Sequence, residues 1–192
     1  MAEPALKRMS VEEFLHWEDG TDTRYELISG SVVAMAPALE GHRILAARLV
    51  RRFEEALERR RPCNAQGEAG IRHPERDDTF FIADVAVTCS LPDARRRYML
   101  EPILIVEVLS SSTERDDRLI KVPAYQRIPS VQEILVVDSG ALYAAVYRRH
   151  GEQWLIQISL GREGVISLES VGIKIPLAQL YEDLDLANEA SP

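Results

Sequence analysis

The sequence predicts a single α/β domain, and three observations predict that class. Residues 102–109 and 131–138 are two nearly continuous apolar runs, which is the pattern of strands covered on both faces. Between 40 and 60, apolar residues recur at helical spacing and indicate an amphipathic helix. The chain has 192 residues, of which 46% are hydrophobic and 28% charged, so it is typical of a globular protein that buries a core.

The N-terminal part reads as a helix followed by a hairpin. The run from Ser10 to Glu13 has the form of a capping box, which predicts a short helix that ends by Gly20. Strands at 24–28 and 31–35 flank Ser29-Gly30, a two-residue hairpin signal. We therefore expect an N-terminal helix and hairpin in front of the main sheet.

The remaining pattern continues the alternation of strands and helices. The run from Ser110 to Thr113 offers N-caps for a helix that extends to about Arg127. We treat 1–192 as one domain with a core of about residues 10–180, and expect 182–192 to be a flexible acidic tail. Further strands are expected at 63–72, 79–88, 142–149, 153–158, 165–168 and 172–175.

Cysteine usage and hydropathy indicate the compartment. Cys63 and Cys89 are too few for a disulfide scaffold and show no CxxC spacing, so both are expected as small buried apolar residues. No apolar run approaches the length of a membrane span, and the first nine residues lack the apolar core of a signal peptide. We expect a cytoplasmic protein without a membrane partner.

The net charge limits the classes of nucleic-acid partner. With 23 basic and 31 acidic residues the chain carries −8, which argues against a sequence-independent nucleic-acid coat. The basic residues concentrate in 43–61 and 95–97. The basic helix is more simply explained as a solvated face, and a phosphate-contacting face is the alternative.

Two carboxylates interrupt strands that are otherwise apolar. Asp84 lies within 81–87 and Glu107 within 103–109. An ionised carboxylate in such a strand is costly unless it meets a cation or water. Pairing with an arginine at a strand end would explain one of them. Two in neighbouring strands favour a shared use, in which one is protonated or a divalent metal lies between them.

The helix that follows carries a third group. Asp117, Lys121 and Tyr125 are spaced at i, i+4 and i+8, close to one helical face, although Pro123 makes that geometry approximate. A surface ion pair is the simpler interpretation. The functional one places the Lys121 ammonium beside the two carboxylates, where it orients a water and offsets charge on a phosphate. Asp, Glu and Lys around Mg²⁺ (or Mn²⁺) suit phosphodiester hydrolysis.

Other polar residues have weaker claims to chemistry. Glu26 is equally a further metal ligand or a strand-edge charge. His42 is better explained as a capping or surface residue than as a catalytic one. Ser110 is better explained as a helix cap than as a nucleophile, and it would also help to shape the site after Glu107. The sequence has no HExxH, GxSxG, P-loop or dinucleotide motif, which disfavours zinc hydrolases, serine hydrolases and nucleotide binding.

Taken in order, these blocks resemble the Uma family, described as restriction endonucleases, within the PD-(D/E)XK nuclease superfamily. The resemblance covers about residues 10–180. The residues that carry it are Tyr25–Gly30, Met35–Pro37, His42, Ala83–Val85, Pro102–Ser110, Thr113–Asp117, Lys121, Tyr125 and Ile128–Glu133.

The resemblance implies a restriction-endonuclease-like core, a mixed central sheet with helices on both faces. It also implies an active site of Asp84, Glu107 and Lys121, with Glu26 and the carbonyl of Val108 completing a metal site. In the superfamily the lysine commonly follows the acid by two residues, where this chain has Leu109. The Uma-like pattern moves the lysine to the next helix. Ala83 replaces a proline of many relatives, a change outside the chemistry.

The function favoured by this pattern is a Mg²⁺-dependent DNA endonuclease that hydrolyses phosphodiester bonds. Cutting two strands takes two sites, which favours a homodimer. A non-catalytic nuclease-fold binding module is the alternative, and a hydrolase of small phosphoesters is a third hypothesis.

Overall fold

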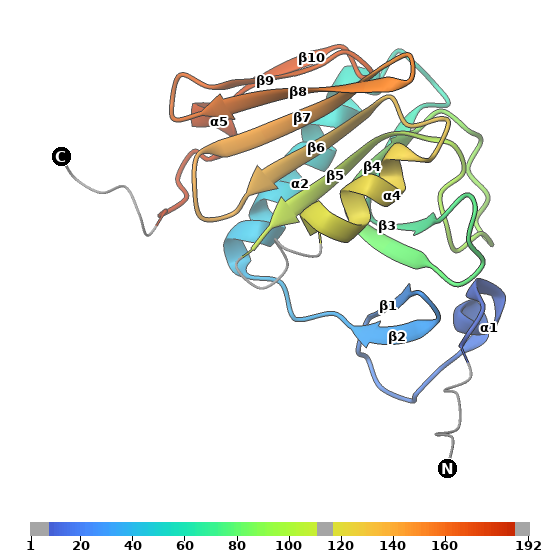
Figure 1. The fold of residues 1–192 in the computed structure, drawn as a ribbon. Coiled ribbons are helices and arrows are strands. Elements are labelled where there is room, and N and C mark those ends of the chain that lie inside the picture. Colours follow the sequence, from blue (N-terminus) through green and yellow to red (C-terminus); the bar gives the residue numbers. More distant parts are fainter. Residues whose placement is uncertain (1–7, 111–116, 187–192) are drawn as a thin grey trace.

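The computed structural model describes residues 8–110 and 117–186 (Figure 1). Within these ranges eight strands form one sheet and two short strands form a second. The strands of the large sheet are β1 (Tyr25–Ile28), β2 (Ser31–Ala34), β3 (Asn64–Arg72), β4 (Phe80–Thr88), β5 (Pro102–Leu109), β6 (Glu133–Asp138), β7 (Tyr143–His150) and β8 (Gln153–Leu160). The small sheet pairs β9 (Val165–Leu168) with β10 (Ile173–Pro176).

The large sheet is mixed, as predicted. Its order is β2-β1-β4-β5-β6-β7-β8, with β3 paired to β4 beside this path. β5 and β6 run parallel, and the other paired strands are antiparallel. The two apolar runs of the sequence therefore become the adjacent parallel pair at the centre of the sheet.

Helices cover both faces of the sheet, which confirms the predicted layers (Figure 1). On one face α2 (Glu40–Leu57) buries Leu45, Leu49 and Phe53 against β4 and β5. On the other face α4 (Val122–Gln126) buries Val122 and Tyr125. Burial of these apolar stripes is the main stabilising contribution to the layers.

One edge of β4 is divided between two strands. β1 pairs with β4 at Leu27 and Phe80, and β5 pairs with β4 from Val85 onward. The stretch 81–84 lies between these two ladders. This gap in strand pairing is where the sheet opens toward the candidate site.

The N-terminal elements form as the sequence predicts. The Ser10 hydroxyl accepts from the Glu13 N–H at 3.2 Å and the Ser10 N–H donates to Glu13 Oε2 at 2.8 Å, a capping box that starts α1 (Val11–His16). The hairpin turn places Ser29 at φ 51° and Gly30 at φ 80°. A Cβ at Gly30 would lie 2.5 Å from the Arg8 Cβ, so conformation and space both require glycine.

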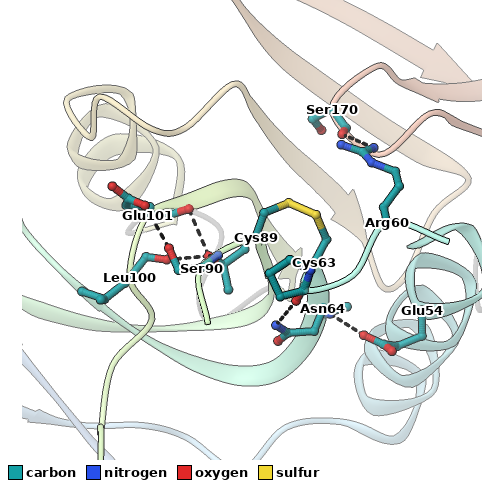
Figure 2. Close-up of a disulfide and its surroundings, with 12 residues drawn as sticks. Glu54, Arg60, Cys63, Asn64, Cys89, Ser90, Leu100, Glu101 and Ser170 are labelled. Carbon is teal, nitrogen blue, oxygen red and sulfur yellow. Dashed lines mark hydrogen bonds between the residues drawn. A yellow bond between two sulfur atoms is a disulfide. The ribbon is translucent and has the colours of Figure 1, made fainter. Parts of the chain in front are cut away.

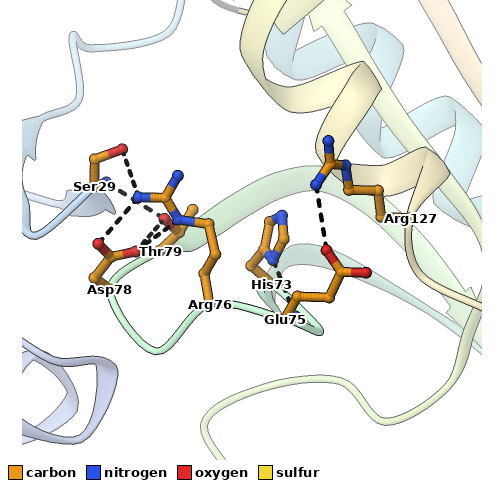
Figure 3. A network of polar contacts seen from close by, with 7 residues as sticks. All are labelled: Ser29, His73, Glu75, Arg76, Asp78, Thr79 and Arg127. Atoms are coloured by element: carbon orange, nitrogen blue, oxygen red, sulfur yellow. Dashed lines mark hydrogen bonds and ion pairs between the residues drawn. The ribbon is translucent and has the colours of Figure 1, made fainter.

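A polar network in the β3–β4 loop connects the hairpin and α4 to the sheet (Figure 3). Arg76 donates to Asp78 at 2.8 Å and to the Ser29 hydroxyl at 3.0 Å. On the other side Arg127 pairs with Glu75 at 3.2 Å. Burial, with Arg76 nearby, lowers the pKa of His73, which favours the neutral ring that accepts from the Glu75 N–H.

The two cysteines form a disulfide, which corrects the expectation that they are unpaired (Figure 2). The β3–β4 register pairs Asn64 with Thr88, so Cys63 and Cys89 lie opposite each other at the next position. Cys63 is buried as expected, whereas Cys89 is only partly buried. The pairing of the two depends on a strand register that spacing alone does not reveal. The disulfide also removes the cysteine argument for a reducing compartment.

The helix predicted between Thr113 and Arg127 has a different form. Its described part is a π-helical turn, η1 (Asp117–Lys121), followed directly by α4. Pro123 lies in the first turn of α4. The N-caps proposed at 111–113 lie outside the described residues.

The C-terminal segment adds an element that the sequence did not suggest. α5 (Leu177–Leu180) buries Leu177 and Leu180 in the α2 core, and Leu184 and Leu186 pack partly against it. The last six residues of the predicted tail, 187–192, lie outside the described residues. No helix within the described ranges is long and apolar enough to cross a membrane.

Breaking the disulfide should lower the free energy of unfolding by about 3 kcal/mol, because it closes a loop across 26 residues of sequence. Urea denaturation of the oxidised and reduced protein measures this difference. The double variant Cys63→Ser, Cys89→Ser should match the reduced protein and show no response to reductant. Two reactive thiols in the unfolded, non-reduced protein would contradict the pairing.

Candidate active site

A cavity of about 360 Å³ opens at the gap along β4. The hairpin, the start of α2, β4, β5 and η1 all contribute to its wall. Seven residues singled out by the sequence line it: Glu26, His42, Asp84, Glu107, Ser110, Asp117 and Lys121. Two others contact these residues without lining the cavity: the Val108 N–H donates to Asp84, and the Tyr125 hydroxyl donates to Glu107.

Two of the carboxylates replace missing strand contacts. Glu26 Oε1 accepts from the Ile82 N–H at 2.8 Å, beyond the point where the β1–β4 ladder ends. Asp84 Oδ2 accepts from the Val108 N–H at 2.7 Å, beyond the end of the β4–β5 ladder. Each acid thus satisfies a backbone donor that strand divergence leaves free. This explains why the sequence tolerates charge at these two strand positions.

The Lys121 ammonium lies within a group of three acids. Its Nζ is 3.0 Å from Glu26 Oε1, 3.2 Å from Asp117 Oδ1 and 3.6 Å from Glu107 Oε1. The lysine side chain is 8% exposed. Burial alone would lower the pKa of Lys121, but these carboxylates outweigh it and raise the pKa above its ordinary value. The lysine is therefore charged at neutral pH.

Glu107 is the most deeply buried acid of the group, at 1% exposure. Burial raises its pKa well above the ordinary value, Lys121 opposes that rise, and the nearby Asp84 and Asp117 carboxylates add to it. The Tyr125 hydroxyl donates to Glu107 Oε1 at 2.6 Å and fixes the carboxyl group. Burial beside Glu107 also raises the pKa of Tyr125 well above 10, so the phenol stays a donor.

His42 is more closely tied to the acids than a capping or surface residue would be. Its Nε2 lies 3.1 Å from Asp84 Oδ2, and its side chain is 15% exposed. In the part of the chain that the structure describes, the buried Nδ1 has no hydrogen-bond partner. The contact with Asp84 orients the imidazole ring at the cavity wall.

Most of the basic helix does not face the cavity. Arg48 and Arg60 donate to the carbonyls of Leu180 and Ser170, which hold the C-terminal segment (Figure 2 for Arg60). Arg51 pairs with Glu55, and both side chains are exposed. From this helix Arg43 lines the cavity. Arg51 is solvated, as the simpler interpretation expects, whereas the carbonyl contacts of Arg48 and Arg60 belong to neither interpretation.

The cavity rim contains residues that sequence reasoning missed. Residues 33–39 are uncharged and mostly exposed, and they form one side of the opening. Arg24, which is also exposed, lines the cavity and pairs with Glu68 across it. An apolar, solvent-exposed run directly after a hairpin was the available signal. Its relevance depends on the fold that brings it beside Asp84 and Glu107.

The donor set suits a hard divalent cation. Four carboxylates, Glu26, Asp84, Glu107 and Asp117, face one lysine and one histidine, so the group carries excess negative charge. Carboxylate oxygens are the ligands that Mg²⁺ prefers. No three His, Cys, Asp or Glu side chains within 8–110 and 117–186 converge on one point, because the Lys121 ammonium lies between three of the acids. The carboxylate donors suit Mg²⁺ in their chemistry. In this structure the Lys121 ammonium offsets part of their negative charge.

Glu107→Gln should remove a pH-dependent loss of stability. The pKa of Glu107 is raised in the folded protein, so the native state binds more protons than the unfolded chain and stability falls as the pH rises above about 4.5. Each unit of the rise corresponds to about 1.4 kcal/mol. In EDTA, urea unfolding should show the variant gaining stability relative to wild type between pH 5 and pH 8. A constant difference across that range would contradict the buried acid.

Comparisons with known proteins agree with this architecture. A solved structure described as a putative nuclease belonging to DUF820, from Anabaena variabilis, superposes with a TM-score of 0.71. It is 16% identical, and the match covers 90% of this chain and 97% of that one. At this identity the likeness establishes the fold, which is that of the predicted nuclease-like core.

Two curated relatives come from Synechocystis sp., and both are uncharacterized proteins. The protein slr1290 is 28% identical over 185 residues, covering 92% of this chain and 93% of its own. The protein sll1609 is 27% identical over 177 residues, covering 90% and 99%. The Uma2 family model, described as "Putative restriction endonuclease", matches residues 11–178. Because that match spans most of the sequence, the chain belongs to the Uma2 family of restriction-endonuclease-like proteins.

Proposed function

We propose that the protein is a Mg²⁺-dependent DNA endonuclease (with Mn²⁺ as a substitute) that hydrolyses phosphodiester bonds at the candidate site. The observation that supports this best is the buried Lys121 ammonium, which shares one cavity with Asp84 and Glu107. Membership of a restriction-endonuclease-like family supports the reaction class.

Asp84 and Glu107 would hold the metal, with Glu26 and the Val108 carbonyl as further ligands. When bound, the metal would polarise the phosphate and lower the pKa of a bound water. Lys121 would orient the attacking water and offset negative charge at the phosphate. Asp117 and Tyr125 act as positioning residues, since Asp117 holds the ammonium and Tyr125 fixes Glu107. His42 would position Asp84 through Nε2, and Ser110 would shape the wall beside Glu107.

The outer part of the cavity supports a nucleic-acid substrate. Arg24 and Arg43 are exposed on its wall, where they would contact phosphates of the strand that enters. The overall charge of −8 opposes binding elsewhere on the surface. We expect weak, salt-sensitive DNA binding in the absence of metal. A homodimer would bring two such sites to the two strands, and the cytoplasm would supply both DNA and Mg²⁺.

The alternative is a non-catalytic binding module. The observation that favours it is the direct pairing of Lys121 with three carboxylates, which stabilises the cavity without any metal. It predicts neither cleavage nor metal binding.

Replacement of Lys121 should abolish cleavage, and it should also lower stability because the ammonium pairs with three buried acids. With Mg²⁺ or Mn²⁺, wild type should nick supercoiled plasmid, and Lys121→Met should be at least about 100-fold slower because it loses the group that orients water and offsets charge. Single-turnover assays on plasmid and on labelled oligonucleotides measure the rate. Circular dichroism and thermal melts report whether the variant is folded.

Lys174→Met is the matched control, because Lys174 is an exposed lysine on β10 away from the cavity. It should cleave at the wild-type rate. Equal activity in Lys121→Met would remove Lys121 from the chemistry. Hydrolysis of a model phosphodiester without cleavage of any polynucleotide would favour the small-phosphoester hypothesis.

Metal binding separates the endonuclease from the binding module. Titration calorimetry with Mn²⁺ should show binding to wild type and at least about tenfold weaker binding to Asp84→Asn, since one charged ligand is lost. Glu55→Gln, an exposed acid on α2 outside the cavity, should bind like wild type. Absence of binding and of cleavage in wild type would favour the module.

A further inference from the structure

A strained residue of β3 lies on the wall of the candidate site. Glu68 lines the cavity and adopts φ 53°, the left-handed region that favours glycine. The register of β3 on β4 places Glu68 opposite Asp84. Two carboxylates at opposite positions of paired strands repel each other. Backbone conformation and charge therefore both disfavour a glutamate at this position.

The contacts of Glu68 do not offset the cost of this conformation. Its carboxylate pairs with the Arg24 guanidinium, and the two side chains are 65% and 46% exposed. An exposed ion pair contributes less to stability than a left-handed backbone costs at a residue with a Cβ. Glycine would remove that cost, and β3 has glycine at positions 67 and 70. Folding stability therefore does not account for a glutamate at position 68.

The place of the Arg24–Glu68 ion pair indicates what the glutamate does. β1 and β3 lie along opposite edges of β4, and Arg24 immediately precedes β1. The pair therefore crosses β4 near the stretch 81–84, where one edge of that strand has no ladder. Both side chains line the cavity that contains Asp84. The pair thus holds an oxyanion against a guanidinium in the outer part of the candidate site.

The second arginine of the cavity wall differs from the first. Arg43 is exposed, and no acid within the described ranges forms an ion pair with it. Glu68 therefore neutralises one of the two arginines that line the cavity and leaves the other available. The two arginines provide a comparison within one site, because only Arg24 should respond to a change at position 68.

We propose that Arg24 forms a phosphate subsite and that Glu68 is its internal competitor, which occupies the guanidinium until a phosphate of the entering strand displaces it. Arginine binds carboxylates and phosphates through the same planar set of donors, so one anion excludes the other. Release of Glu68 requires little energy, because its carboxylate is already mostly exposed to water. The inference rests on the proposed function, in which Arg24 contacts the substrate, and adds that Glu68 weakens the binding of nucleic acid.

Fluorescence anisotropy of a labelled duplex oligonucleotide, titrated with the full chain in EDTA at low salt, tests the proposal. Glu68→Gln should lower Kd about 3- to 5-fold, because it removes the competing charge and keeps the size of the side chain. The same substitution should have no effect in an Arg24→Met background. In an Arg43→Met background it should keep its full effect.

Glu55→Gln is the matched control for the change in net charge. Glu55 also forms an exposed ion pair with an arginine, Arg51, but the pair lies on α2 outside the cavity. This variant should bind the oligonucleotide with the wild-type Kd. A gain in affinity equal to that of Glu68→Gln would show that both act through the overall charge, and would overturn the proposal.

Glu68→Gly tests the backbone strain separately. Glycine adopts φ 53° without steric cost, so this variant should melt about 2 °C or more above Glu68→Gln, which also lacks the carboxylate. Equal melting temperatures would remove the reason to assign Glu68 a role outside stability, and the inference would fall with it.

Three results of the binding assay would also overturn the proposal. The first is an unchanged or higher Kd in Glu68→Gln, and the second is a gain in affinity that persists without Arg24. The third is the absence of DNA binding by both wild type and Glu68→Gln. Plasmid cleavage by wild type in Mg²⁺ is measured independently, so the proposed function can stand when this inference fails.

Discussion

The buried ammonium of Lys121 is the interaction on which the rest of the site depends. It contacts acids from three elements, Glu26 of β1, Glu107 of β5 and Asp117 of η1. One positive charge thus connects the hairpin, the central sheet and the helix. A buried group of this kind is costly to desolvate, and removing one partner usually costs more than the group contributes as a whole. The lysine is therefore structural as well as a candidate for chemistry.

A second constraint comes from the divided edge of β4. Between the β1–β4 ladder and the β4–β5 ladder, backbone N–H groups have no strand partner. The N–H of Ile82 donates to Glu26 instead, and the N–H of Val108 donates to Asp84. The same two carboxylates then point into the cavity that the divergence creates. Both carboxylates therefore have a structural role as hydrogen-bond acceptors for the backbone. A polar site on a sheet interior can be stable because its acids already have this role.

The sequence predicted what depends on local periodicity and failed where register and packing decide. The strands, α2 and the capping box follow from spacing, and Asp84 and Glu107 stood out as charges in apolar runs. The Cys63–Cys89 disulfide required the β3–β4 register. The His42 contact with Asp84 required α2 to be placed against the sheet. The roles of Arg48 and Arg60 depended on the C-terminal segment, whose own helix the sequence did not suggest.

The π turn that precedes α4 has a consequence for alignment. On a regular α-helix, residues eight apart have drifted by about 80° around the axis. A π turn contains more residues than an α turn and so rotates less per residue, which offsets part of that drift. Asp117 and Tyr125, at the two ends of the segment, can therefore both contact the group that surrounds Lys121. The turn acts as a one-residue insertion that changes which side of the helix the later residues face. Deleting a residue from 118–120 would rotate Tyr125 away from the side on which Asp117 lies.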